Sequence, residues 1–441
     1  MSTATTNSRF GRELRVICGA EHVVEDPSEL HHQHILGINP ATAVTPSSAD
    51  EIVAVLRFAN EHGLSVVPAG GFTQQQTGNR PPQVDVLLYT SRLTELEHYD
   101  PADLTIGVGA GWTVAHLSAR VAADKLFFAG DPALPERSTV GGLLAAGFYG
   151  PHRHGFGGPR DYCIGVRFVT GDARKAKGGG RVVKNVAGYD MMKLLIGSQG
   201  TLGIITSASF KLFPAPRQTR TFMAEFVSSD EAFAFRNRVL QSPLDPICLE
   251  LVSPGAGMLL MPGASWSILL RAGGSDAVLA RYREELGSAV SREFEEQDEC
   301  DLWRAVSDFS HLVHEKHPRS LLISMTLPLA DVQPVLDSLA TLAQSNSFTL
   351  AAIGRVGVGH LLIAMWPTLD AEVTLVNFVN AVSGLRNRLP RDVSMAVLSC
   401  PAEARHHVAA WGPTPTDLES MRAVKLTLDP RDILNRGRFL L

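Results

Sequence analysis

Glycine is distributed unevenly along this chain of 441 residues, and that unevenness is the sequence feature that most constrains the fold. Much of the glycine lies between Gly63 and Gly203, often as consecutive pairs. Glycine has no Cβ atom, so paired glycines permit tight turns and let a ligand approach successive backbone amides. We therefore expect loops in the first half of the chain whose backbone forms a binding surface.

The composition excludes several classes of protein. Apolar residues make up 45% and charged residues 19%, which favours a folded chain of about two or three domains over a disordered one. The net charge of −5 shows no basic excess of the kind that binds nucleic acid. No apolar run approaches the ~20 residues of a membrane helix, and the start lacks a signal peptide's apolar stretch. We expect a cytoplasmic protein with no direct membrane span; peripheral attachment to the inner membrane through partners stays open.

The sequence lacks the usual short motifs of metal and nucleotide sites. Its five cysteines are scattered, with no C-x-x-C pair, so no local iron–sulfur or zinc motif exists and no metal site is predicted. Walker A, H-E-x-x-H and G-x-S-x-G patterns are absent. Trp112 takes the place of the third glycine in the one segment close to a Rossmann fingerprint. Kinases, simple nicotinamide dehydrogenases, serine hydrolases and zinc proteases are therefore disfavoured.

Periodicity predicts alternating helices and strands. Ser48 and Glu51 have the spacing of a capping box, apolar residues follow at helical intervals, and Gly63 ends this helix. Pro214 and Pro216 mark a boundary, because proline continues neither a central strand nor a helix. No internal repeat is evident. The predicted divisions are residues 1–40 (N-terminal extension), 41–220, 221–420 and 421–441 (C-terminal tail).

Four glycine-containing segments stand out as candidate binding loops: residues 68–73, 138–142, 150–161, and 179–190 with 197–206. The first can direct its amides and the Thr73 hydroxyl at an anion, and the third places two arginines and two histidines in a loop. Taken singly, each segment also fits an ordinary turn, close helix packing or a solvated surface loop.

Read together in this order, the four segments resemble the flavin domain of the vanillyl-alcohol oxidase / p-cresol methylhydroxylase (PCMH-type) flavoproteins. More narrowly, residues 131–142, 180–190 and 429–438 are similar to motifs of the FAD-binding subunits of bacterial glycolate oxidases. The resemblance covers 40–216 and 350–441, with 221–350 matching only in outline. It implies an α+β protein: a PCMH-type FAD-binding domain of two α+β subdomains over 41–220, a cap-like substrate or interface α+β domain over 221–420, and a tail that returns to the FAD domain.

The resemblance also implies positions for the FAD contacts. The loop that would hold the pyrophosphate consists of Ala69, Gly70, Gly71, Phe72 and Thr73. The contacts to the ADP side would come from Ser138, Val140, Gly141 and Gly142. The central cleft would be lined by Gly155, Arg160 and Asp161. Backbone bonds to flavin or adenine would come from Gly203, Ile204 and Ile205. Phe72 stands where a third glycine is usual, so no covalent flavin link is indicated there.

The chain departs from relatives that oxidise 2-hydroxy acids at one motif. Those relatives carry G-D-G-N-x-H, whereas here Val358 takes the acidic position and Leu362 the histidine position. A general base must lie within hydrogen-bond reach of its proton, so no catalytic residue is assigned. Arg355 and His360 are able to bind a carboxylate, but we favour surface or interface roles for both. The acidic run 293–301 is predicted to be a solvated helix face.

These observations predict an FAD-dependent oxidoreductase subunit of a glycolate-oxidase-like complex. Its flavin would take electrons from a small 2-hydroxy acid, directly or through a second flavin subunit, and pass them to an iron–sulfur subunit. The alternatives are a free-standing FAD-dependent 2-hydroxy-acid or alcohol dehydrogenase, and a scaffold subunit that has lost flavin, supported only by Phe72.

Overall fold

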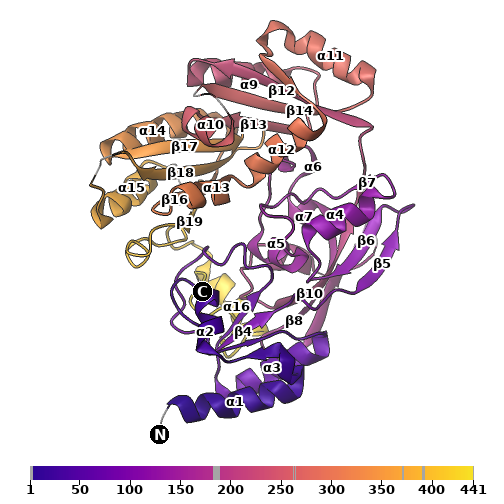
Figure 1. The fold of residues 1–441 in the computed structure, drawn as a ribbon, viewed down its shortest axis with the longest axis vertical. Helices are drawn as coiled ribbons and strands as arrows, with labels where there is room; N and C mark the ends of the chain where they lie inside the picture. Colours follow the sequence, from indigo (N-terminus) through magenta and orange to yellow (C-terminus); the bar gives the residue numbers. More distant parts are fainter. Residues whose placement is uncertain are drawn as a thin grey trace. The chain divides into compact units, whose positions relative to one another are not determined.

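The computed structural model describes residues 3–181, 189–261, 263, 265–369, 372–389 and 393–440. The chain forms two compact units (Figure 1). Unit 1 comprises Met1–Tyr149, Gly158–Pro214 and Pro413–Leu441, and unit 2 comprises Gly150–Gly157 and Ala215–Gly412. No helix in the described ranges is long and apolar enough to cross a membrane.

Unit 1 begins with helix α1 (Thr3–Cys18) and a four-stranded sheet. The sheet has the order β1 (Val23–Val24), β2 (Thr42–Val44), β4 (Val86–Tyr89), β3 (Val66–Ala69), and β4 runs parallel to both β2 and β3. Helix α3 (Ala49–His62) links β2 to β3. The Ser48 side chain accepts from the Glu51 amide at its start, and Gly63 ends it with φ +67°, as the sequence predicts.

A second sheet of unit 1 is antiparallel and contains five strands. Its order is β5 (Leu96–Asp100), β6 (Thr105–Gly109), β10 (Ile204–Lys211), β8 (Cys163–Val169), β9 (Lys175–Gly179). The short helices associated with it are α4 (Val114–Ala122), α5 (Val140–Ala146), α7 (Pro159–Tyr162) and α8 (Met191–Leu195). The predicted helices at 113–123 and 189–196 are confirmed, with ends shifted by one or two residues.

The smaller elements of unit 1 connect these sheets. They are helix α2 (Pro27–Leu30), the 3-10 turns Ala20–His22 and His31–Gln33, and the strand pair β7 (Leu126–Phe127) with β11 (Phe213–Pro214). Helix α16 (Leu418–Leu428) begins the C-terminal part of the unit.

Unit 2 is built on an eight-stranded antiparallel sheet in the order β15-β12-β14-β13-β17-β18-β16-β19. The strands are β12 (Gln218–Phe226), β13 (Cys248–Val252), β14 (Trp266–Gly274), β15 (Arg292–Phe294), β16 (Leu321–Thr326), β17 (Phe348–Arg355), β18 (His360–Pro367) and β19 (Ser394–Ser399). The helices are α6 (Arg153–Phe156), α9 (Ser229–Gln241), α10 (Pro254–Leu260), α11 (Asp276–Leu286), α12 (Glu296–Ser307), α13 (Phe309–Lys316), α14 (Val332–Ser345) and α15 (Leu375–Arg388), with 3-10 turns at Gly287–Ala289 and Leu329–Asp331.

The order of these elements contains a repeat that the sequence does not reveal. Strands and main helices follow as β12-α9-β13-β14-α11-β15 and again as β16-α14-β17-β18-α15-β19. In both halves the spatial order places the fourth strand beside the first, then the third and the second. This is the β-α-β-β-α-β arrangement of ferredoxin-like folds. The two copies share this topology although no repeat is evident in the sequence.

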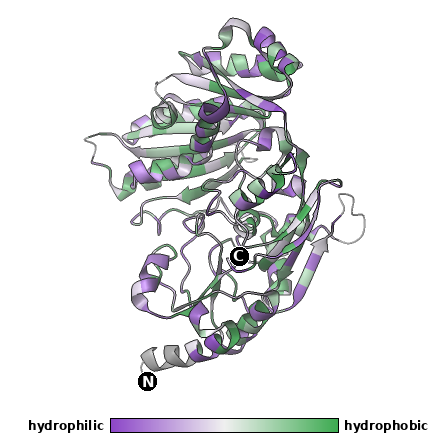
Figure 2. Ribbon diagram, turned by 45° about the vertical axis from the view of Figure 1, so that its right-hand side comes forward, coloured by the Kyte–Doolittle hydropathy of each residue, from purple (hydrophilic) through white to green (hydrophobic). Residues whose placement is uncertain are grey.

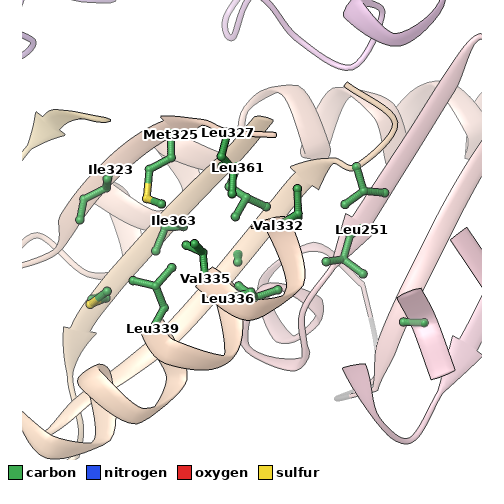
Figure 3. Packing of buried hydrophobic residues seen from close by; sticks show 14 of the residues in the cluster. Leu251, Ile323, Met325, Leu327, Val332, Val335, Leu336, Leu339, Leu361 and Ile363 are labelled. Carbon is green, nitrogen blue, oxygen red and sulfur yellow. The ribbon is translucent and has the colours of Figure 1, made fainter. Parts of the chain in front are cut away.

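Each face of the unit 2 sheet has its own hydrophobic core. Helices α9, α11, α14 and α15 cover one face, and α10, α12 and α13 cover the other. Figure 3 shows Val332, Val335, Leu336 and Leu339 of α14 pointing at Ile323 and other strand residues. In Figure 2 the helices carry hydrophilic and hydrophobic segments in alternation, typical of helices packed on one side.

Candidate cofactor site

Unit 1 contains an open cavity of about 650 Å³, a volume that includes solvent space at its mouth. Four separate parts of the chain line it: the loop after β3, the residues around α5, the turn before β10, and the C-terminal tail. Its lining includes Gly70, Gly71, Phe72, Thr73, Gln74, Gln75, Pro132, Ser138, Gly142, Ala145, Ala146, Phe148, Gln199, Gly200, Asn435 and Arg438. Residues distant in sequence thus form one site.

The loop after β3 provides unbonded backbone donors. Within the described residues, no acceptor receives the amides of residues 70–75. Gly71 is required for the loop's close packing, because a Cβ there would collide with the Arg137 carbonyl. A Cβ at Gly70 would collide with the Thr139 hydroxyl. Successive amides without a protein acceptor, placed beside a cavity, are typical of an anion site.

Phe72 adopts a backbone conformation that glycine would favour. Its φ is +63°, in the left-handed region that few side chains occupy. The Phe72 ring lies 6.2 Å from the Tyr89 ring, measured between centroids, and packs against the core of the four-stranded sheet. The loop therefore keeps the geometry of a glycine turn although the third glycine is replaced.

Helix α5 forms the opposite wall, but its first amides are already used. Those of Val140 and Gly141 donate to the carbonyls of Trp112 and Ala110, at 2.8 and 2.9 Å. The Gly142 amide donates to the Thr139 hydroxyl. Of these three residues only Gly142 lines the cavity, and a Cβ added there would approach nothing except Thr139. The absence of a side chain at Gly142 therefore leaves room in the cavity for a ligand.

Two hydroxyl groups connect the walls. Thr73 Oγ1 lies 3.1 Å from Ser138 Oγ, and Ser138 in turn donates to the Ala133 carbonyl at 2.6 Å. Ser138 is buried, so its hydroxyl holds the loop and the start of α5 in a fixed relation.

The C-terminal tail contributes two residues that sequence reasoning missed. The Asn435 amide group donates to the Gln199 carbonyl, whereas its Oδ1 atom is buried and has no hydrogen-bond partner among the described residues. Arg438 donates to the Thr77 carbonyl at 2.7 Å and to Gln75. Both belong to the tail motif 429–438, which the sequence analysis named only through the resemblance. No local sequence pattern indicates which residues of this motif line the cavity.

A buried lysine anchors this tail. Lys425 Nζ lies 2.5 Å from Asp429 Oδ2 and donates to the carbonyls of Thr201 and Leu434. Asp429 is completely buried and also accepts from the amides of Ile433 and Leu434. The tail is thus fixed against unit 1 immediately before Asn435 reaches the cavity.

Comparison with protein families identifies the chemistry of this unit. Residues 40–176 match the model "FAD binding domain", and residues 409–439 match "FAD linked oxidases, C-terminal domain". These two domain matches make the chain an FAD-dependent oxidoreductase. The second match covers the tail that completes the cavity, so both matched regions contribute to one site.

Individual relatives agree with this family. Glycolate oxidase subunit GlcD of Bacillus subtilis is 25% identical over 90% of this chain and 88% of the relative, and D-lactate dehydrogenase of Archaeoglobus fulgidus is 26% identical over 90% of each. Glycolate oxidase subunit GlcE of Escherichia coli is 33% identical over 43% of this chain and 51% of the relative. The chain is therefore similar to FAD-linked 2-hydroxy-acid oxidases and dehydrogenases.

Solved structures confirm the predicted α+β, PCMH-type fold. The substrate-bound p-cresol methylhydroxylase has a TM-score of 0.75 at 14% identity, covering 99% of this chain and 97% of that one. The 4-ethylphenol oxidase of Gulosibacter chungangensis has a TM-score of 0.73 at 16% identity, again covering 99% and 97%.

The cavity of this FAD-linked oxidoreductase fits the cofactor. The free amides of residues 70–75 suit a diphosphate, which accepts hydrogen bonds and carries negative charge. The unpartnered Asn435 oxygen and the open space at Gly142 suit a polar ligand lying close to the backbone. FAD binding is consistent with every one of these features.

Besides Val140 and Gly141, seven residues named from the resemblance do not line this cavity. Gly155 belongs to unit 2, where its amide donates to the Ile247 carbonyl at 3.1 Å. Asp161 accepts from the Gly158 amide at the start of α7. Arg160 lines a second, mainly apolar cavity of unit 1. Ile204 and Ile205 begin β10 and pair with Val169 and Phe168 of β8. Gly203 immediately precedes β10 and lies beside Phe168. Ala69 precedes the cavity as the last residue of β3. Most of the segment 180–190 lies outside the described residues.

Unit 2 contains a buried polar cluster at the motif where the chain departs from the G-D-G-N-x-H pattern. Arg355 forms an ion pair with Glu250, with 3.8 Å between Nε and Oε2, and its Nη1 lies 3.3 Å from His360 Nδ1. Ser324 Oγ lies 3.0 Å from His360 Nε2. Arg355 and Glu250 are at most 1% exposed. The favoured expectation was a surface or interface role, and its surface alternative is wrong, because the strand register places both Arg355 and His360 inside the sheet layers.

The electrostatics of His360 follow from this burial. Burial, followed by the charges of Arg355 and Arg153, holds the pKa of His360 well below its usual value. The ring is therefore neutral at physiological pH, and it joins Arg355 to Ser324 rather than carrying a charge.

The acidic run 293–301 is also not simply a solvated face. Glu299 is buried on α12, where it accepts from Thr221 at 2.7 Å and from Thr219 and pairs with Arg271 at 3.3 Å. The prediction fails at this residue because two threonines on β12 and an arginine on β14 supply partners that sequence spacing does not reveal.

Proposed function

We propose that this chain is the FAD-holding subunit of a 2-hydroxy-acid oxidase or dehydrogenase complex whose electrons leave through an iron–sulfur subunit. The observation that carries the proposal is the run of unbonded amides at residues 70–75 beside a cavity completed by the tail. The similarity to glycolate oxidase subunits supports the substrate class.

FAD in this cavity would accept two electrons from a 2-hydroxy acid and release them to a redox partner. The amides of residues 70–75 would bind the diphosphate, and Asn435 would orient the cofactor through its side-chain oxygen. Gly142 would leave room for close approach, and Ser138 with Thr73 would keep the two walls at a constant separation. We propose no FAD contact for Val140 and Gly141 through their amides, because these already donate within the protein.

The cysteines support an iron–sulfur centre on another chain. Four of the five are buried free thiols, and burial raises the pKa of Cys18 and of Cys163 to about 12. A thiolate is the form that ligates iron, so such thiols are poor ligands. Within the described ranges no three His, Cys, Asp or Glu residues are grouped as a metal site requires.

The paired state of Arg355 supports substrate oxidation with help from a second flavin subunit. Glu250 and His360 already contact the guanidinium, so Arg355 is not a free carboxylate receptor. The similarity to D-lactate dehydrogenase over 90% of the chain favours a second candidate, in which the chain turns over a 2-hydroxy acid alone.

Purification of the chain alone, and then with its partners, tests these candidates. The proposal expects a yellow protein that has no glycolate or lactate turnover by itself and gains turnover when the partner subunits are added. Turnover by the isolated chain with a dye acceptor would establish the free-standing dehydrogenase instead. A protein that takes up no FAD would contradict both candidates.

A further inference from the structure

The five-stranded sheet of unit 1 carries a polar cavity separate from the FAD cavity. Strand register aligns one residue of every strand in a single row, namely His98, Gly107, Ser209, Gly165 and Gly179. Residues paired across neighbouring strands share a face of the sheet, so the His98 ring and four small residues lie along one row. The two cavities have no lining residue in common.

The adjacent row on the same face places charge beside this row. Ser207 is paired with Arg167, and Arg167 with Lys177. Arg167, Lys177 and Arg181 line the cavity together with a single carboxylate, that of Glu97. The Arg167 Nη1 atom lies 2.9 Å from Glu97 Oε1, which leaves Lys177 and Arg181 as the excess positive charge of the lining.

Several polar atoms in and beside the cavity have no protein partner. The hydroxyls of Ser207 and Ser209 make no hydrogen bond to any described residue. The His98 ring lies against Gly107, and both of its nitrogens are buried without a partner in the described part of the chain.

The titration of His98 agrees with an excess of positive charge. Burial lowers the pKa of His98, and Arg181 and Arg167 lower it further, whereas Glu97 and Asp100 act in the opposite direction without offsetting them. A bound anion would reverse the effect of the two arginines.

We propose that this face of the sheet binds a phosphate group, either of free phosphate or of a small phosphate monoester. Lys177 and Arg181 would neutralise its charge, and the Ser207 and Ser209 hydroxyls would donate to its oxygens. A phosphate dianion matches the two excess cations better than a carboxylate, which carries one charge. The Ser207 and Ser209 side chains line the cavity on one strand, so their hydroxyls are placed to donate to the anion within it.

Phosphate titration of the FAD-loaded protein, followed through the His98 ring signals in NMR, tests the proposal. Inorganic phosphate and glycerol 3-phosphate are added separately at constant ionic strength. We expect a saturable rise in the pKa of His98, because a bound anion favours the protonated ring. Tighter binding of phosphate identifies the free ion as the source, and tighter binding of glycerol 3-phosphate identifies the ester.

Matched lysines on β9 provide the control. Lys177→Ala and Arg181→Ala should each weaken phosphate binding about tenfold, by loss of a charge-assisted bond. Lys175→Ala removes the same charge from the same strand, but Lys175 pairs with Asp50 at 2.6 Å and does not line the cavity, so binding should persist. Equal weakening in all three variants, or no saturable response of His98, would leave an adventitious ion only and overturn the proposal. FAD content is recorded throughout, so failure here leaves the proposed function intact.

Discussion

The FAD cavity of unit 1 leaves polar groups without protein partners, whereas the polar cluster of unit 2 pairs its buried charges with one another. In the cavity, the amides of residues 70–75 and the Asn435 oxygen have no acceptor or donor among the described residues. In the cluster, Arg355 contacts both Glu250 and His360, and His360 contacts Ser324. The first arrangement leaves donors free for a ligand, whereas the second brings two opposite buried charges into an ion pair.

This difference separates a binding site from a structural element that resembles one. Residues 70–75 are half-buried and their amides have no acceptor among the described residues, so an anionic ligand can accept from several of them at once. A buried ion pair resists removal of either partner, because the remaining charge is uncompensated. Substitutions should therefore affect FAD binding in unit 1 and stability in unit 2.

The largest expected effect is that of Arg355→Met in unit 2. It leaves the fully buried Glu250 carboxylate without its counter-charge, and should lower the free energy of unfolding by about 3–5 kcal/mol. Urea unfolding measures this change. The double variant Glu250→Leu/Arg355→Met is the control and should recover most of the stability, since it removes both charges. A stable Arg355→Met protein with a raised KM for a 2-hydroxy acid would instead make Arg355 a substrate ligand.

Gly142→Val should have the second largest effect, and on FAD binding rather than on folding. The new side chain enters the cavity and meets little protein, so overpacking against FAD should cost about 1–3 kcal/mol, or about 10- to 100-fold in Kd. Flavin fluorescence quenching measures the Kd, and urea unfolding of the apoprotein measures stability. Gly158→Ala, whose Cβ would approach nothing closer than 3.9 Å, should retain FAD. Unchanged FAD affinity in Gly142→Val would remove α5 from the site.

Asn435→Leu should have a smaller effect of the same kind. It removes the unpartnered Oδ1 and the bond to Gln199, and should weaken FAD binding by about 1–2 kcal/mol, close to tenfold in Kd. Arg431→Met is the matched control on the same tail, since Arg431 is exposed, bonds the Asn60 carbonyl and does not line the cavity. Equal FAD affinity in the two variants would show that the tail does not touch the cofactor.

The sequence predicted several local elements around this cavity. Helix α3, the loop 68–73 and the turn before β10 follow from capping residues, glycine pairs and alternation, which act over a few neighbours. Long-range relations were not predictable. Asn435 reaches the cavity because Lys425 and Asp429 fix the tail, and Gly155 falls in unit 2 because the short segment 150–157 joins that unit.

Strand register also determines the burial of residues that sequence spacing did not predict to be buried. A surface or interface role was favoured for Arg355 and His360, yet β17 and β18 place them opposite each other, and β13 adds Glu250 beside Arg355. The repeat in unit 2 also depends on how strands pair. Two copies can keep the same strand order when only the apolar pattern of each strand is kept, so the sequence does not reveal the repeat.

The smallest expected effect is on the pH dependence of stability, and it tests whether His360 is neutral in the folded protein. The folded pKa of His360 lies well below its usual value because of burial, Arg355 and Arg153, so the unfolded chain binds a proton at this residue first as pH falls. The contribution is fully present above the ordinary histidine value, about pH 6.5, and is lost below it at no more than about 1.4 kcal/mol per pH unit. His360→Gln should therefore lose less stability than the unsubstituted protein between about pH 7.5 and about pH 5.5. His407→Gln, which replaces an exposed histidine of the same unit, should keep the original pH dependence. The same pH dependence of the urea midpoint in all three proteins would mean that His360 has the same pKa in the folded and the unfolded chain, which would contradict the effect of its burial beside Arg355 and Arg153.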